Sequence, residues 1–176
     1  MTNRTWKHRG LGAMAGLCAL GALSACSSTT ALPTVMIMDC RSDRVEITEN
    51  IDWEGVRPMR MRIVDGEYRP MVMHFEKDRP YALVVENADR EAHNLWAPDF
   101  LKSAIALNSI QFGDKAPAKG CVNGVRLTPG ATATLRFVPQ WEGRFEVFDQ
   151  PVRILPAQNA ASVMHIIQPR AGLAAR

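Results

Sequence analysis

The sequence predicts an all-β protein, a β-sandwich with one short helix inserted, and three observations support this prediction. Between residues 44 and 168, apolar residues fall in short runs that are β-branched or alternate with polar residues, as in half-buried strands. Turn signals separate several of these runs, at Asp65-Gly66, at residues 78–80 and at Pro129-Gly130. One segment, residues 98–110, shows helical spacing instead.

The runs place the expected elements in chain order. Pro98 suits the first turn of a helix, and Phe100, Leu101 and Ala104 recur at helical spacing after it. Residues 111–123 are expected to form an exposed loop, and residues 171–176 a flexible tail. Strands are expected at 44–48, 59–64, 71–76, 81–86, 124–127, 131–138, 143–148 and 163–168.

The first 25 residues have the features of a lipoprotein signal peptide, which is removed. Arg4, Lys7 and Arg9 form a basic start, and the uncharged run at 11–23 is too short to span a bilayer as a helix. Leu23-Ser24-Ala25-Cys26 resembles the lipobox of bacterial prolipoproteins, in which the cysteine is lipidated. The alternative is an ordinary secretory signal that is cut after an alanine.

Lipid on Cys26 would make residues 26–34, which are small and polar, a tether between the membrane and a domain at 35–170. The 151 residues left after cleavage suffice for one domain with its own core. This organisation predicts a protein of the bacterial cell envelope that faces the periplasm. Ser27 resembles the residue that directs lipoproteins to the outer membrane in some bacteria.

Charge and motifs exclude several classes of function. The net charge of +3 comes from the signal peptide, because the mature chain has 18 basic and 18 acidic residues. No basic block with interleaved aromatic residues remains, so no nucleic-acid partner is expected. The chain has no nucleophile elbow, P-loop, His-Glu-x-x-His or dinucleotide fingerprint, so no enzyme activity is expected.

Two cysteines remain in the mature domain. Cys18 leaves with the signal peptide and Cys26 carries the lipid, which leaves Cys40 and Cys121 in a compartment where disulfides persist. A disulfide between them is the simple expectation. The alternative is that one or both are buried thiols or metal ligands.

Three segments, taken in order, carry a family resemblance. The first is the strand at 79–87, which ends in an asparagine and leads to His93 and then to the run at 97–100. The second is a hairpin at 125–130. The third begins with Gly143-Arg144-Phe145. Together they resemble the cupredoxin superfamily, specifically the bacterial secreted cupredoxin-like copper-binding proteins. The resemblance implies a Greek-key β-sandwich with His93 as the first copper ligand. Where that family has its ligand cysteine, this chain has Asp149. The resemblance also implies that His93 and the Asp149 loop lie at the same end of the sandwich, beside the helix that begins at Pro98.

The missing cysteine changes the expected metal chemistry. A blue type 1 centre needs a thiolate, so the resemblance implies at most a type 2 or Cu(I)-carrier copper site. Copper is expected at His93 together with one or more of Met71, Met73, His74, Asp149 and Met164.

Structural roles that involve no metal stay open for the same residues. Methionines at alternating strand positions also occur as core filler, and a family histidine can persist as a hydrogen-bonding corner residue. His74, and His165 in the last strand, are expected to be structural or surface residues. The competing hypothesis is a metal-free scaffold that binds another envelope protein through its loops.

Lipidation gives the first testable prediction. Labelling with palmitate should mark the wild-type protein, whereas Cys26→Ser should lose the label and leave the membrane or stay unprocessed, because acylation needs the thiol. Cys18→Ser is the matched control and should keep the label. Label retained by Cys26→Ser would contradict the assignment.

Overall fold

The structure is a computed structural model, and it describes residues 33–36, 45–120, 122–149 and 160–169. The expected signal peptide, the lipidation site Cys26, the cysteines Cys40 and Cys121 and the tail at 171–176 lie outside the described residues. Within the described ranges, no helix is long and apolar enough to cross a membrane.

Strands dominate the described residues, and the predicted all-β class with one short inserted helix is confirmed. The short helix is η2 (Asp99–Ala104), and a single 3₁₀ turn, η1 (Val45–Thr48), lies near the start. The strands are β1 (Thr34–Met36), β2 (Pro58–Val64), β3 (Glu67–Arg69), β4 (Val72–Glu76), β5 (Tyr81–Asn87), β6 (His93–Trp96), β7 (Ile105–Phe112), β8 (Gly124–Leu127), β9 (Thr132–Pro139), β10 (Gly143–Val147) and β11 (Ser162–Ile167).

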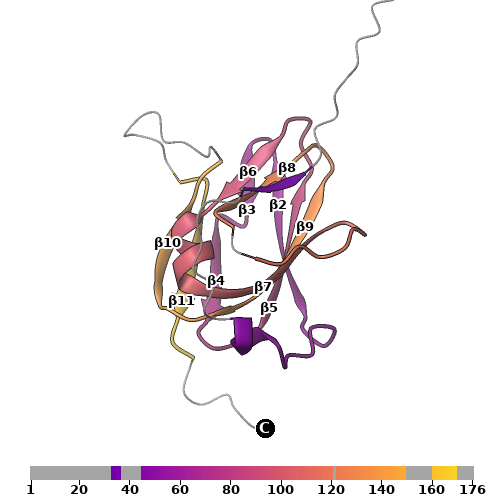
Figure 1. The fold of residues 1–176 in the computed structure, drawn as a ribbon. Coiled ribbons are helices and arrows are strands. Elements are labelled where there is room, and N and C mark those ends of the chain that lie inside the picture. The colour runs from indigo at the N-terminus through magenta and orange to yellow at the C-terminus, as the bar shows by residue number, and fades with distance from the viewer. Residues whose placement is uncertain (1–32, 37–44, 121, 150–159, 170–176) are drawn as a thin grey trace, which may run out of the picture.

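The strands form two layers that face each other. One layer is a five-stranded sheet in the order β3-β2-β5-β9-β7. Two three-stranded sheets, β1-β8-β6 and β10-β11-β4, make the other, and a backbone bridge between Trp96 and Phe148 joins them. Figure 1 shows β4, β10 and β11 with the short helix on one side of the molecule and β6 and β8 at one end. The end of β6 and the end of β10 therefore meet.

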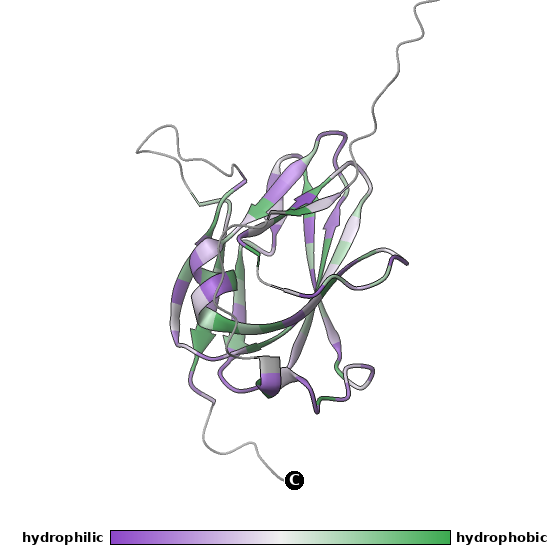
Figure 2. Ribbon diagram, viewed as in Figure 1, coloured by the Kyte–Doolittle hydropathy of each residue, from purple (hydrophilic) through white to green (hydrophobic). Residues whose placement is uncertain are grey.

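Apolar side chains from both layers meet in one core. Polar and apolar residues are interleaved along the strands (Figure 2), and strands such as β2 and β4 contribute alternate side chains to the interior. Phe75 on β4 lies at the centre of an aromatic group, with ring centroids 5.0 Å from Tyr81, 5.3 Å from Phe137 and 5.9 Å from Phe100. The helix is thus anchored through Phe100, which is fully buried.

Two sequence-based expectations about elements are wrong. The helix expected over 98–110 ends at Ala104, whose carbonyl accepts the backbone N–H groups of Gln140 and Trp141, and the rest pairs with β9 as strand β7. The strand expected at 44–48 is instead the 3₁₀ turn η1, which is held where the Thr48 carbonyl accepts the indole N–H of Trp53. The helix is ended by contacts with residues far along the chain, whereas the 3₁₀ turn is held by a residue five positions away.

Candidate functional site

His93 and Asp149, two of the predicted site residues, lie together where β6 begins and β10 has just ended. Nδ1 of His93 is 2.7 Å from Oδ2 of Asp149. The His93 side chain is buried, whereas Asp149 is partly exposed. The expectation that the turn before β6 and the end of β10 meet at the same end of the sandwich is confirmed.

Asn87 fixes the turn that delivers His93. Its side-chain amide donates to the carbonyls of Glu91 and Leu127, and its Oδ1 accepts the backbone N–H of Asp89. The residue is fully buried, so its amide replaces the backbone partners that the turn lacks. The strand-ending asparagine of the sequence pattern therefore shapes the 87–93 turn.

The Asp149 carboxylate is already occupied by protein donors. Its Oδ1 accepts the backbone N–H of Asn94 at 2.6 Å and lies 3.1 Å from the hydroxyl of Tyr68, while Oδ2 faces His93. The Asn94 side-chain amide also donates to the Asp149 carbonyl. The segment that follows β10 is thus tied to β6 by backbone and side chain together.

These contacts decide which way the His93–Asp149 hydrogen bond runs. An aspartate carboxylate can only accept hydrogen bonds, and Oδ1 of Asp149 already accepts the backbone N–H of Asn94. We therefore assign the proton to Nδ1 of His93. A protonated ring nitrogen has no lone pair to offer a metal ion.

Tyr68 contributes a neutral donor to the same group of residues. Burial raises the pKa of Tyr68 far above its ordinary value, and the charge of Asp149 and the hydrogen bond to it raise it further. The phenol therefore stays protonated, and its hydroxyl also lies 2.7 Å from the carbonyl of Asn94. β3 is joined in this way to both β6 and Asp149.

Asp89 lies on the other side of the His93 ring. Its Oδ2 is 3.0 Å from Nε2 of His93, which is buried and has no aligned hydrogen-bond partner among the described residues. Both oxygens of Asp89 accept backbone N–H groups, from Asp65 at 2.8 Å and from Gly66 at 2.7 Å. The contact with His93 is thus close but is not a well-aligned hydrogen bond.

These contacts hold the Asp89 carboxylate in its charged form. The N–H groups of Gly66 and Asp65 lower the pKa of Asp89, and His93 lowers it further. His93 consequently lies between two carboxylates, each fixed by backbone donors. We call Asp89, His93 and Asp149 the carboxylate–imidazole bridge.

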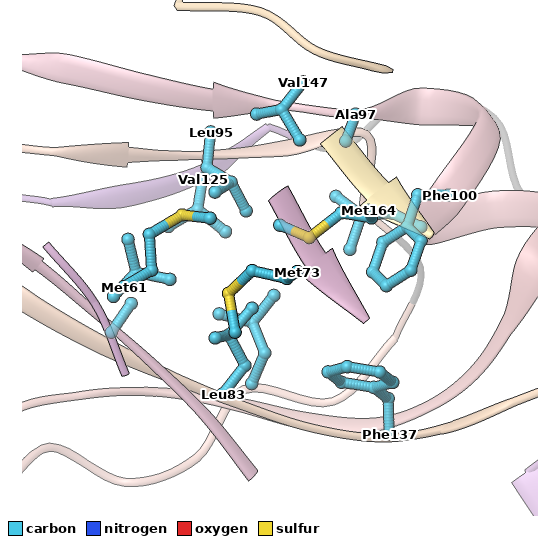
Figure 3. Packing of buried hydrophobic residues seen from close by; sticks show 14 of the residues in the cluster. Met61, Met73, Leu83, Leu95, Ala97, Phe100, Val125, Phe137, Val147 and Met164 are labelled. Atoms are coloured by element: carbon cyan, nitrogen blue, oxygen red, sulfur yellow. The ribbon is translucent and has the colours of Figure 1, made fainter. Parts of the chain in front are cut away.

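The predicted methionine ligands lie elsewhere. Met73 on β4 and Met164 on β11 are in register on parallel strands, and both are buried. Figure 3 shows their thioethers among labelled apolar side chains such as Leu83, Leu95 and Phe100. Both belong to the hydrophobic core cluster, so their position is that of core filler.

The remaining two predicted residues are at the surface. Met71 is exposed, and His74 is an exposed residue of β4. The His74 ring lies against that of His165 on β11, and the centroids of the two histidine rings are 5.3 Å apart. The predicted set is therefore divided between the bridge, the core and the outer face of a sheet.

The donors present do not fit copper at His93. Its Nδ1 is committed to Asp149, its Nε2 faces a carboxylate that already accepts two N–H groups, and the thioethers are in the apolar core. Among the described residues, no group of three or more His, Cys, Asp or Glu side chains is arranged to hold a metal ion. The bridge is a structural unit held by the His93–Asp149 hydrogen bond and by backbone donors to both carboxylates.

Sequence reasoning missed three residues of this site: Tyr68, Asp89 and Asn94. Asn94 follows His93 directly and Asp89 precedes it by four residues, but nothing in the sequence shows that either contacts a carboxylate or a distant turn. Tyr68 is 81 residues from Asp149 and comes near it only through the pairing of β3 with β2. Such contacts depend on tertiary structure.

Comparisons with known proteins give distant structural similarities. No family model matches the chain, and no curated protein matches it. It is similar to a Cu(I) form of an amicyanin mutant, at 11% identity and TM-score 0.38, over 77% of this chain and 98% of that one. A purple cupredoxin from Nitrosopumilus maritimus is 14% identical with TM-score 0.33, over 61% of this chain and 98% of that one.

A third similar structure is a copper nitrite reductase from Nitrosomonas europaea. It is 14% identical with TM-score 0.41, and the match covers 56% of this chain and 33% of the reductase. Because all three TM-scores are below 0.5, we draw nothing from these proteins about the site or the activity of this chain.

Asp89 gives a prediction about pH. Its folded-state pKa is lower than its unfolded value of about 3.9, so its stabilising contribution is present above about pH 4 and is lost as the pH falls through the folded pKa. Asp89→Asn should therefore flatten the dependence of unfolding free energy on pH below about pH 4. Urea unfolding over that range measures it.

The control is Asp114→Asn, which removes the same charge from an exposed turn after β7. If Asp89→Asn and Asp114→Asn change the acid limb of the stability curve equally, Asp89 has no special role in the bridge.

Proposed function

We propose that this chain is a lipid-anchored protein of the bacterial envelope whose cupredoxin-like domain acts as a protein-interaction scaffold without copper at His93. The observation that carries this proposal is the short contact between Nδ1 of His93 and Oδ2 of Asp149. In that contact Nδ1 of His93 is used in a hydrogen bond within the protein, so it does not coordinate a metal ion. The competing function is copper handling at a non-blue site around His93.

The bridge favours the scaffold over copper handling. For copper to bind His93, Nδ1 would have to lose both its proton and its bond to Asp149, or Nε2 would have to displace Asp89. The first change breaks a hydrogen bond between a buried ring nitrogen and a carboxylate, which costs about 1.5–3 kcal/mol. The second change displaces a carboxylate that two backbone N–H groups hold in place. Copper would also gain no thioether in return, because Met73 and Met164 are packed in the core.

The bridge also gives the scaffold a defined loop surface. Asp89 binds the turn at Asp65-Gly66, and the His93 side chain lies beneath a surface pocket of about 550 Å³ between that turn and the 88–91 turn. Arg90 and Glu91 line the pocket and are exposed. A rim of opposite charges held on rigid turns is suited to polar contacts with another protein.

The envelope location is supported by the N-terminal sequence. The lipobox-like run ending at Cys26 and the small polar residues after it suit a lipid anchor with a short tether. A domain held in this way meets partners in or near the membrane plane. Tethering raises the local concentration of such partners, so modest affinity suffices.

Copper titration of His93→Gln tests the metal-free assignment. The variant should bind Cu(II) in air with the same stoichiometry and affinity as the mature wild-type protein. The two proteins should also agree with each other for Cu(I) in the absence of oxygen. His93→Gln should nevertheless lower the unfolding free energy by about 1–3 kcal/mol, because Asp149 loses a buried partner.

A folded His93→Gln protein that loses one copper equivalent would overturn the metal-free assignment. If His93→Gln does not fold, Asp149→Asn gives the same comparison, because it weakens the bond to Nδ1 and leaves the ring in place. In that variant, copper binding should again be unchanged, and a lost or gained equivalent would contradict the proposal.

Site-specific crosslinking tests the interaction surface. A photoreactive residue at Arg90, placed in the full-length chain in its own host, should give a discrete adduct with an envelope protein. The matched control is Arg126, an exposed arginine on β8 that does not line the pocket. Equal adducts at both positions, or none at Arg90, would contradict an interaction surface at this pocket.

A further inference from the structure

The outer face of the β10-β11-β4 sheet carries two histidines side by side. His74 on β4 and His165 on β11 are direct partners in the register of two parallel strands, so both point to the same face. Their rings are 5.3 Å apart between centroids and tilted by 57°. His74 is exposed and His165 is partly exposed, which leaves solvent access to the rings.

This separation fits two imidazoles bound to one ion. At a nitrogen–metal distance of about 2.0–2.1 Å, with each ring centroid about 1.2 Å behind its nitrogen, a tetrahedral angle puts the centroids about 5 Å apart. The tilt between the rings is also compatible with two nitrogens that converge on one point. Small rotations of exposed side chains suffice for the final adjustment.

We propose that His74 and His165 form a surface site for a divalent late transition metal ion, with Cu²⁺ bound most tightly. Imidazole is a good ligand for Cu²⁺, Ni²⁺ and Zn²⁺, and for these ligands Cu²⁺ ranks highest in affinity. Water completes the coordination, because the site is open on its solvent side. It is separate from the carboxylate–imidazole bridge and does not depend on the proposed function.

The residues beside the two histidines determine how many protein ligands the site has. Glu76, the next residue of β4 on this face, is ion-paired with Arg79 at 2.6 Å and is not free to join. Val72, Val163 and Ile167 are apolar. The site therefore has two protein ligands rather than three.

Two charged residues of β10 share this face, Arg144 and Glu146. Arg144 is the partner of His165 in the antiparallel register, and Glu146 is the partner of Val163. A positive charge on the residue paired with His165 lowers the affinity of this face for a cation. Arg144 consequently weakens the site and gives a variant that should strengthen it.

The test uses Cu(II) alone with the mature chain. His74→Ala and His165→Ala should each weaken Cu(II) binding by about tenfold or more, since removal of even an outer partner of a metal-bound histidine costs that much. The double variant should bind Cu(II) more weakly than either single one, because it leaves no imidazole at the site. Arg144→Gln should tighten binding. The electron paramagnetic resonance spectrum should show two coordinated nitrogens in the wild type and one in each single variant.

His93→Gln is the matched control, and it separates this site from the bridge. Copper lost in His74→Ala and kept in His93→Gln supports the surface site. Copper lost only in His93→Gln overturns the surface site and the metal-free assignment together. Unchanged copper binding in both surface variants, with folding verified by circular dichroism, overturns the surface site alone.

Discussion

The hydrogen bond between His93 and Asp149 is the interaction on which the arrangement at this end of the domain depends. It joins the start of β6 to the residues after β10, and Tyr68 brings β3 to the same carboxylate. On the opposite side of the ring, Asp89 holds the β2–β3 turn through two backbone N–H groups. One imidazole thus connects segments from both layers of the sandwich, where a metal ion could otherwise have joined them.

The presence of a carboxylate at position 149 has a simple physical consequence. A carboxylate is a hard acceptor that satisfies N–H and O–H donors well, so Asp149 organises the loops through hydrogen bonds within the protein. The thioethers that would have made a soft Cu(I) site lie in the core, where Met73 and Met164 fill space beside Leu83 and Phe100. The interior around these thioethers is consequently apolar, whereas the buried side chains of Tyr68 and His93 lie at the end of the domain beside Asp149.

The sequence predicted much of the fold and little of the site. Alternation located β2, β4, β5 and β8 to β11 closely, because each of these strands has one buried face. It failed at β7, where Ile105 and Leu107 fit a helix as well as a strand, and pairing with β9 decided the outcome. The proximity of His93 and Asp149 was predicted from a family resemblance. Asp89 and Tyr68 were not, since their roles depend on contacts across the chain.

The protonation of His93 tests the central claim most directly. A long-range ¹H–¹⁵N spectrum of the histidine-labelled domain reports which ring nitrogen carries a proton. The hydrogen-bonded bridge predicts a protonated Nδ1 on His93, shielded from solvent exchange, that stays protonated when Cu(I) is added. An unprotonated Nδ1 on His93, or one that shifts on binding Cu(I), would contradict it and return the residue to the role of a copper ligand.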